Sequence, residues 1–293
     1  MEKVLIIGGC GYIGSRLFQY LSEKKYSVDT VDTEWFGNFV NPKNIKCNYN
    51  TLSKKFLNSY GVIILLAGHS SVQMCKDNMF ASFKNNVNNF INLLSKLSDQ
   101  LFIYASSSSV YGNTKNISAK EDYERYIPTN YYDLTKKTID YYAHLSKISY
   151  YGLRLGTVNG FSPNLRVDLM INKMYEAARN TGKIKIINAN THRPILGMID
   201  LCRAISQIIR MKDKPGIYNL ASFNMTVKEI SYYVKKTVGK VGIIEGKGQA
   251  GYNFSINTNK FKNTFNFKFL DDVESIIASL KIGYKKAYKS IRF

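Results

Sequence analysis

The chain opens with a short apolar run followed at once by three spaced glycines, and this stretch restricts the fold more than any other. Residues 4–7 are Val, Leu, Ile and Ile, and glycines follow at Gly8, Gly11 and Gly14. Apolar residues then recur at helical spacing over 13–21, so the pattern predicts strand, tight turn and helix. One glycine permits the turn, one lets the main chain approach a pyrophosphate, and one lets the helix pack on the strand. The phosphates would lie at the N-terminus of the helix, beside Tyr12 and Ile13.

A second apolar run at 28–31 ends at Asp32, eighteen residues after Gly14. An acidic residue at this place accepts hydrogen bonds from an adenosine ribose and repels a 2′-phosphate, so NAD is favoured over NADP. The alternative is that Asp32 only caps the turn that follows it. The next buried run, 62–67, ends in Leu66, Ala67 and Gly68, where small residues allow a cofactor to lie close to the backbone.

Strand and helix patterns alternate through most of the chain, which predicts an α/β fold with a Rossmann-type, doubly wound parallel sheet. A smaller C-terminal α/β domain is expected for substrate. The predicted helices include one that opens at Asp200 and one that begins with a Thr226-x-x-Glu229 capping box. Further strands are predicted at 45–47, 101–105, 150–155, 184–187, 217–221 and 241–244, and further helices at 83–94, 165–178, 257–265 and 271–282.

Four serines, at 106–109, follow the strand at 101–105, at the end of a strand where open α/β sheets bind their ligands. About twenty residues later, Tyr132 and Lys136 stand at positions i and i+4 of a predicted helix, so their side chains are adjacent. An ammonium beside a phenol favours the phenolate, which would let the tyrosine exchange protons with a substrate hydroxyl. The alternative is that Tyr132 and Lys136 are an ordinary exposed pair on a helix surface, without a catalytic role.

The chain of 293 residues carries 41 Lys plus Arg against 21 Asp plus Glu, a net charge of +20. This charge favours anionic partners, among them nucleic acid, anionic membranes and phosphorylated small molecules. The basic residues occur as dispersed pairs, which favours a solvated basic surface, so nucleic-acid binding is not expected. A member of this fold that binds RNA or a dinucleotide without turnover stays as a remote alternative, and a gel shift at moderate salt tests it.

The cysteine and histidine pattern gives no reason to expect a metal. The four cysteines are far apart without a Cys-x-x-Cys pair, and none of the three histidines has a second ligand at i+4. The N-terminus enters the first strand directly and no apolar run approaches the length of a membrane span. We therefore expect a reducing cytoplasmic location and no membrane partner.

These motifs, in this order and spacing, resemble the extended short-chain dehydrogenase/reductase family, the NAD-dependent nucleotide-sugar epimerases and dehydratases. The resemblance covers essentially the whole chain. It also rests on 107–112 (Ser-Ser-Ser-Val-Tyr-Gly), on 153–158 (Leu-Arg-Leu-Gly-Thr-Val) and on Arg193-Pro194.

The resemblance implies a role for each matching residue. Tyr132 would be the general acid/base, Lys136 would bind the nicotinamide ribose and tune the tyrosine, and Ser107 would hydrogen-bond the reacting sugar oxygen, with an uncertainty of one position among its serine neighbours. Asn86 would be structural. The resemblance also implies that the nucleotide sugar is bound by Ser108, Thr157, Asn159, Arg166 and Arg193. For Arg166 the equally supported alternative is an exposed position on a helix, without contact to substrate.

The implied reaction is an NAD-dependent epimerisation of a nucleotide-diphosphate sugar, expected at C4, through a transient keto sugar. Dehydratases of this family carry Asp-Glu after the catalytic residue, and Ser108 and Ser109 stand there instead, which argues against dehydration. A 4-ketoreductase or a dehydrogenase with net NAD(H) turnover is the alternative.

The expected division places residues 1–165 and 197–223 in the NAD-binding domain and residues 166–196 and 224–293 in the substrate domain. A homodimer is implied by the resemblance, through the helices that begin near Phe80 and Tyr131.

Overall fold

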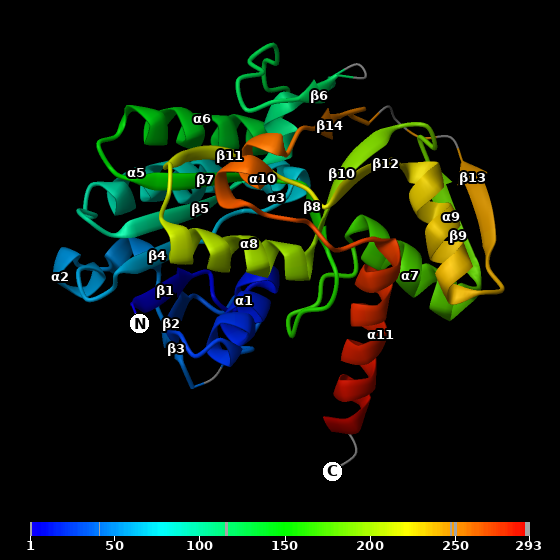
Figure 1. The fold of residues 1–293 in the computed structure, drawn as a ribbon, viewed down its shortest axis with the longest axis horizontal. Helices are drawn as coiled ribbons and strands as arrows, with labels where there is room; N and C mark the ends of the chain where they lie inside the picture. The colour runs from blue at the N-terminus through cyan, green and yellow to red at the C-terminus, as the bar shows by residue number, and fades with distance from the viewer. Residues whose placement is uncertain (1, 41, 115–116, 247, 249–250, 291–293) are drawn as a thin grey trace.

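The computed structural model describes residues 2–40, 42–114, 117–246, 248 and 251–290. Its main sheet has seven parallel strands in the order β11-β7-β5-β4-β1-β2-β3 (Figure 1). The strand bounds are β1 Lys3–Ile7, β2 Ser27–Asp32, β3 Asn44–Lys46, β4 Val62–Leu65, β5 Leu101–Ser107, β7 Tyr150–Leu155 and β11 Gly216–Leu220. The chain runs from β1 outward to β3, then returns to the other side of β1 with β4. The strand order therefore reverses between β1 and β4, which is where open α/β sheets bind ligands. The predicted Rossmann-type sheet is confirmed.

The alternation of side chains along β1 explains why helices cover both faces of this sheet. Val4 and Ile6 pack with the helix α1 (Tyr12–Glu23) and with α8 (Met198–Met211), whereas Leu5 and Ile7 belong to a separate core. That second core includes side chains from α5 (Asn89–Leu94) and α6 (Tyr131–Leu145). Since both faces are buried, the strands are apolar throughout, as a doubly wound sheet requires.

A smaller region lies beside the carboxyl end of the sheet, on the right in Figure 1. Three strands, β8 (Thr157–Asn159), β10 (His192–Gly197) and β12 (Phe223–Thr226), form one sheet in the order β12-β10-β8. A second sheet pairs β9 (Lys183–Ile187) with β13 (Gly242–Gly246). Both pack against the helices α7 (Met170–Thr181), α9 (Val227–Val238) and α11 (Val273–Ser290) in a third core. The short strands β6 (Ser118–Ala119) and β14 (Ser255–Ile256) pair with each other.

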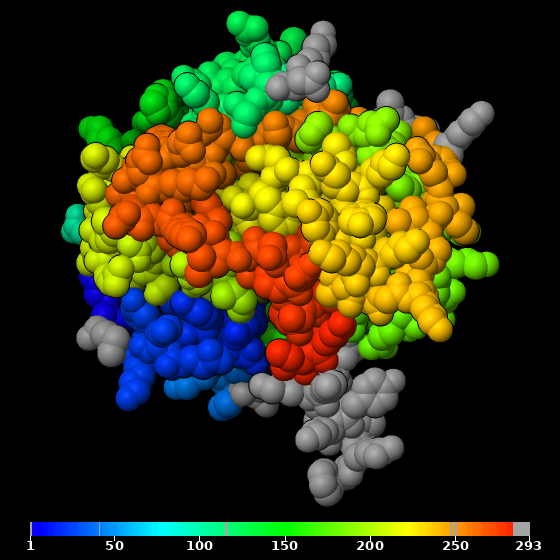
Figure 2. All heavy atoms as spheres, turned by 45° about the vertical axis from the view of Figure 1, so that its right-hand side comes forward, coloured from blue at the N-terminus to red at the C-terminus, as the bar shows by residue number. Residues whose placement is uncertain are grey.

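One segment expected in the smaller domain packs against the large sheet. Phe261 and Phe265 of α10 (Asn259–Phe265) are fully buried in the same core as Tyr151 and Tyr218 of β7 and β11. Figure 2 shows this orange segment lying beside α8, while α11 in red continues toward the smaller region. The C-terminal part of the chain thus covers both regions, and the division into two domains stays a proposal.

Several predicted helix starts lie a few residues from those in the structure, and two of them have a clear cause. The helix expected from 165 begins at Met170, because 161–169 form a loop that is fixed by the Asn172 side chain, which donates to the carbonyl oxygen of Arg166. The helix expected to open at Asp200 begins at Met198, since Gly197 is its N-cap. The capping box at Thr226 and Glu229 is present as predicted. The helix pattern at 83–94 covers the last residue of α4 (Met79–Phe83), a π-helical turn over Lys84–Asn88 and α5, and the helix α3 (Val72–Asp77) precedes them.

Candidate active site

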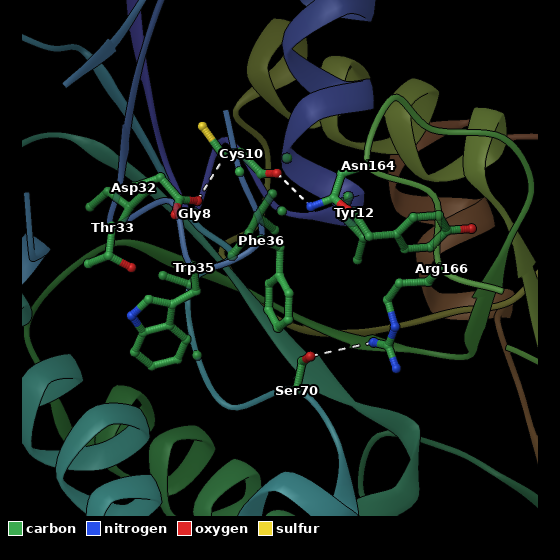
Figure 3. A pocket seen from close by; sticks show the side chains of 18 of the residues that line it. Gly8, Cys10, Tyr12, Asp32, Thr33, Trp35, Phe36, Ser70, Asn164 and Arg166 are labelled. Carbon is green, nitrogen blue, oxygen red and sulfur yellow. Dashed lines mark hydrogen bonds between the residues drawn. The ribbon is translucent and has the colours of Figure 1, made fainter. Parts of the chain in front are cut away.

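A cavity of about 540 Å³ lies at the reversal of strand order, above the glycine turn (Figure 3). Most of its walls come from four segments far apart in the chain: the turn after β1, the end of β2 with the loop that follows, the loop after β4, and residues 164–168. Residues 47–49 and Asn85 also contribute to the lining. The predicted cofactor-binding residues of the first three segments all line it: Gly8, Gly11, Tyr12, Ile13, Gly14, Asp32, Leu66, Ala67 and Gly68.

The three glycines of the turn are required for different reasons. Gly8 has a φ of +88°, and a Cβ there would lie 2.4 Å from the backbone nitrogen of Ala67. At Gly14 a Cβ would lie 2.1 Å from the carbonyl oxygen of Gly8, so this glycine lets α1 approach the turn. A Cβ on Gly11 would meet only the Gly8 oxygen, at 3.3 Å, because Gly11 faces the cavity. Gly11 is also the N-cap of α1 and has no side chain to occupy its free N–H groups, which is the arrangement that binds phosphate.

Asp32 shapes the turn as well as lining the cavity. Its Oδ2 accepts a hydrogen bond of 3.0 Å from the Cys10 backbone N–H, and its Oδ1 accepts one of 2.8 Å from the Glu34 N–H. Each oxygen has a second lone pair, which leaves the carboxylate able to accept from a ribose hydroxyl. The expected ribose contact is therefore compatible with the geometry, and so is the expected turn cap.

Two aromatic side chains that the sequence analysis did not single out also line the cavity. Trp35 and Phe36 follow Asp32 and are 61% and 67% exposed. The Trp35 ring lies 5.4 Å from that of His69, and Figure 3 shows the Phe36 ring pointing toward Arg166 and Ser70. The sequence did hold an indication of this: two adjacent aromatic residues lie in the polar loop that follows Asp32. Apolar side chains in such a loop cannot be buried in a hydrophobic core, so they are available to contact a ligand.

The loop after β4 is held against the turn by backbone and amide hydrogen bonds. The N–H groups of Leu66 and Ala67 both donate to the Ile7 carbonyl oxygen, at 2.8 and 3.0 Å. Asn86 accepts from the His69 N–H at 2.8 Å and donates to the His69 carbonyl oxygen at 3.1 Å. The Asn86 amide also donates to Thr135 of α6, so its contacts are those of a structural residue, in keeping with the expectation.

The three predicted catalytic residues come from two neighbouring elements. Ser107 is the last residue of β5, and Tyr132 and Lys136 lie one turn apart at the start of α6. The Lys136 Nζ lies 5.9 Å from the centre of the Tyr132 ring and donates a 2.7 Å hydrogen bond to the Ala105 carbonyl oxygen on β5. Lys136 is therefore fixed between the helix and the strand, beside the tyrosine.

Burial dominates the titration of this pair. It raises the pKa of Tyr132 to about 12, and the Ser107 side chain acts in the opposite direction. Burial also lowers the pKa of Lys136 to about 8. The expectation that the neighbouring ammonium favours the phenolate stays a prediction, because in the protein alone burial outweighs the groups that lower the pKa of Tyr132.

The residues predicted for the nucleotide sugar do not gather in one place. Ser108 is buried directly after Ser107, and Thr157 begins β8. Arg166 lines the cavity beside the glycine turn; it is ion-paired to Asp168 at 2.6 Å and donates to Ser70 Oγ at 3.4 Å. Arg166 thus lies on a loop at the predicted cofactor cavity, and the alternative of a helix surface is wrong.

Asn159 has a structural environment. Its side chain is fully buried, its Oδ1 accepts from the Ile171 N–H at 2.9 Å, and its amide donates to the Thr157 carbonyl oxygen at 2.8 Å. These bonds hold β8 against the start of α7. The prediction that Asn159 contacts substrate therefore does not fit the structure, because the amide is already engaged.

Arg193 lies on β10, outside the lining of the cavity. Its guanidinium packs 5.9 Å from the Phe254 ring and donates to the neighbouring His192 carbonyl oxygen. Within 2–40, 42–114, 117–246, 248 and 251–290 it forms no ion pair with a carboxylate. A half-buried cation without a carboxylate is suited to an anionic ligand.

A buried carboxylate beside the catalytic residues was not predicted. Asp133 follows Tyr132 and is fully buried, and it accepts hydrogen bonds from the Ser109 hydroxyl, from Asn130 at 2.6 Å and from the Tyr252 hydroxyl at 3.0 Å. Tyr252 comes from the C-terminal part of the chain, so this contact joins the smaller region to α6.

The described part of the chain contains no group of three or more His, Cys, Asp or Glu side chains placed to hold a metal ion. None of the helices described is long and apolar enough to cross a membrane.

Comparison with known proteins agrees with this arrangement. Residues 4–221 match the family described as NAD dependent epimerase/dehydratase family. Protein CapI of Staphylococcus aureus is 30% identical over 241 residues, which are 73% of this chain and 71% of that protein. A UDP-glucose 4-epimerase from Thermotoga maritima, solved with UDP-glucose, has a TM-score of 0.85 at 19% identity and covers 98% of this chain and 99% of its own. MoeE5, solved with UDP-glucuronic acid and NAD, has a TM-score of 0.83 at 21% identity, with 97% and 99% covered.

The match to the family extends from β1 through β11 and so includes the glycine turn, Asp32, Ser107, Tyr132 and Lys136. The solved structures share the fold over nearly the whole chain. From its sequence and its fold together, the chain belongs to the NAD-dependent epimerase/dehydratase family.

Proposed function

We propose that this enzyme is a nucleotide-sugar epimerase that inverts a hydroxyl-bearing carbon, C4, through a transient keto sugar. The observation that carries the proposal is the position of Ser107, Tyr132 and Lys136 at the carboxyl end of β5, where the sheet of an NAD-dependent fold binds its ligands. The two residues after Ser107 are serines, whereas dehydratases of the family carry Asp and Glu there. These two positions therefore lack the acid that would protonate a leaving hydroxyl in a dehydration. The likeness to a UDP-glucose 4-epimerase adds support for C4.

The cavity suits the family's cofactor, NAD. A Cβ at Gly8 or Gly14 would collide with backbone atoms, whereas Gly11 leaves the space above the α1 N-terminus open for a pyrophosphate. We assign Asp32 to the adenosine ribose and Lys136 to the nicotinamide ribose. The exposed rings of Trp35 and Phe36 provide apolar surface in the same cavity. When bound, NAD supplies the acceptor for the hydride of the sugar carbon and, in its oxidised form, a positive charge.

The chain's own residues then handle the proton. Tyr132 Oη takes the proton of the sugar hydroxyl and later returns it, and Ser107 Oγ donates a hydrogen bond to the same sugar oxygen. Because burial raises the pKa of Tyr132 to about 12, the phenol is an acid at neutral pH until positive charge enters the site. The Lys136 ammonium, fixed on the Ala105 carbonyl oxygen, already lies beside the ring, so the further positive charge would come with the oxidised cofactor.

Arg193 is assigned to the diphosphate of the substrate. It is a half-buried guanidinium, and burial lowers its pKa, so an approaching phosphate gains both charge and hydrogen bonds there. Thr157 and Ser108 are assigned to the sugar. Arg166 lines the same cavity as the glycine turn, so we assign it to the phosphates of the cofactor rather than to the sugar.

We also propose a homodimer. The helix α6 carries an exposed apolar stripe of Tyr131, Leu134, Tyr141 and Leu145, and Phe80 on the neighbouring α4 is 85% exposed. Exposed apolar side chains grouped on adjacent helices mark an interaction surface.

The proposal is tested by incubating the protein with NAD and a panel of UDP-, GDP- and dTDP-hexoses. NADH absorbance is followed and the product is identified by NMR. A C4 stereoisomer without net NADH is the expected result. NADH accumulating with a keto sugar would instead establish a dehydrogenase, or a ketoreductase working in reverse.

The control is a pair of neighbouring tyrosines. Tyr132→Phe is expected to lower kcat by about 10²- to 10⁴-fold, the contribution of a general acid or base. Tyr131→Phe removes a hydroxyl from the exposed neighbour and is expected to turn over like wild type. Equal losses in both variants would contradict the assignment of Tyr132.

A further inference from the structure

Asp133 is a buried carboxyl group that the proposed reaction does not use. It is fully buried at the start of α6, directly after Tyr132. Its Oδ2 accepts from Asn130 at 2.6 Å and from the Tyr252 and Tyr126 hydroxyls at 3.0 and 3.4 Å, whereas its Oδ1 accepts from the Ser109 hydroxyl. A buried carboxyl is costly, so each of these partners matters to which form of the acid is present.

Ser109 links this carboxyl group to the catalytic serine. The Ser109 Oγ lies 2.8 Å from the Ser107 Oγ, and the Ser109 backbone N–H also donates to Ser107 at 3.2 Å. Each hydroxyl has one proton to donate. The three groups therefore form a chain in which the proton position on Asp133 favours one direction for each hydrogen bond up to Ser107.

The two directions have opposite consequences for a substrate. If Asp133 is ionised, Ser109 donates to it and the Ser109 Oγ is left to accept from Ser107, which draws the Ser107 proton away from the sugar oxygen. If Asp133 is protonated on Oδ1, it donates to Ser109, Ser109 donates to Ser107, and the Ser107 proton is free to point at the substrate. A keto oxygen, which has no proton, can be held only by the second arrangement.

We propose that Asp133 is the positioning acid of this site: in its protonated form it directs the Ser109 and Ser107 hydroxyls so that Ser107 donates to the reacting oxygen. The proposal rests on the proposed function, in which Ser107 contacts that oxygen. No bond to carbon changes in this step; each proton stays on its own oxygen, and only the directions of the O–H bonds are set. Asp133 thus acts through Ser109 and touches neither substrate nor cofactor.

The surroundings of Asp133 shift its titration toward the neutral acid. Burial raises its pKa, against the hydrogen bonds that it accepts. The groups that face it or lie close to it are phenols and a thiol, which are neutral below alkaline pH, and the nearby lysine ammonium groups are engaged by backbone carbonyl oxygens. These groups are Tyr126, Tyr132, Tyr252, Cys75, Lys136 and Lys137.

Asp133→Asn tests the proposal because an asparagine side chain imitates the protonated acid. Its amide can donate to Ser109 while its oxygen accepts from Asn130 and Tyr252, at every pH. As the pH rises, wild type loses the productive direction and the variant does not. We expect the ratio of kcat of D133N to kcat of wild type to increase by about tenfold per pH unit above the pKa of Asp133.

A constant or falling ratio would overturn the proposal, because it would mean that Asp133 acts as a carboxylate or only as part of the fold. Ser109→Ala breaks the chain, so in the S109A background the change from Asp133 to Asn is expected to leave the pH profile of kcat unaltered. A pH-dependent ratio that persists in that background would equally contradict a path through Ser109.

Infrared spectroscopy of the full-length protein keeps this test separate from the proposed function. A protonated carboxyl gives a C=O band that a carboxylate lacks, and we expect this band in the difference spectrum between wild type and D133N at neutral pH. If no nucleotide sugar is turned over but the band is present, the proposed function fails and the protonation of Asp133 stands. If the band is absent, Asp133 is ionised and the inference is wrong whatever the substrate.

Discussion

At the scale of single residues, Lys136 ties the site to the stability of the fold. Burial lowers its pKa to about 8 from 10.5, so folding disfavours the ammonium. Between these two values the unfolded chain binds a proton that the folded chain does not, and stability rises with pH. We expect wild type to gain up to about 3 kcal/mol relative to Lys136→Met between pH 8 and pH 10.5. Denaturant unfolding of both proteins across this range measures the gain, and parallel curves would contradict it.

Asp32 offers a second residue-scale prediction, because its carboxylate has two structural hydrogen bonds as well as the expected ribose contact. Asp32→Asn keeps the acceptor Oδ1 for the Glu34 N–H but removes the negative charge. The preference for NAD over NADP is expected to fall by about tenfold or more, the value of a hydrogen bond to a charged group together with a lost repulsion. Titration with both cofactors measures it. An unchanged ratio of the two dissociation constants would leave Asp32 as a turn cap alone.

At the scale of elements, the turn between β1 and α1 separates packing from ligand binding. Gly14→Ala places a Cβ 2.1 Å from the Gly8 oxygen and is expected to destabilise the protein by at least about 2 kcal/mol. Gly11→Ala meets only one atom, at 3.3 Å, and faces the cavity, so it is expected to weaken NAD binding with little change in stability. Unfolding and NAD titration of both variants distinguish the two roles, and the reverse pattern would contradict them.

Elements were predictable wherever a local pattern decides the structure. The strand at 150–155 has the expected limits because a continuous apolar run suits a strand buried on both faces, and the capping box fixes the start of α9. The helix predicted from 165 begins only at Met170, because the loop at 161–169 is anchored to residues distant in sequence: Ser162 contacts Ser15 and the backbone of Tyr12. Local periodicity carries no information about such contacts.

At the scale of the whole molecule, the order of the motifs in the sequence indicated some of the residues that lie together in the site. It did not indicate others. The proximity of Ser107, Tyr132 and Lys136 was predictable because β5 and α6 each carry a recognisable motif. The cluster around Asp133 was not, since Tyr252 reaches it from 119 residues away and no repeat or spacing links the two. The same holds for Arg166, whose place at the cavity depends on the path of the loop after β8.

The exposed apolar stripe on α6 leads to a prediction about assembly. Leu134 is 40% exposed and Phe80 on α4 is 85% exposed, so both would be buried if these helices pair with those of a second copy. We expect wild type to sediment as a dimer and the double variant Phe80→Asp, Leu134→Asp to sediment as a monomer, because burying two carboxylates at an apolar interface is costly. Tyr232→Asp, at a 60% exposed position on α9, is the matched control and should remain dimeric. A dimer that survives the double substitution would place the interface elsewhere, and a monomeric wild type would exclude it.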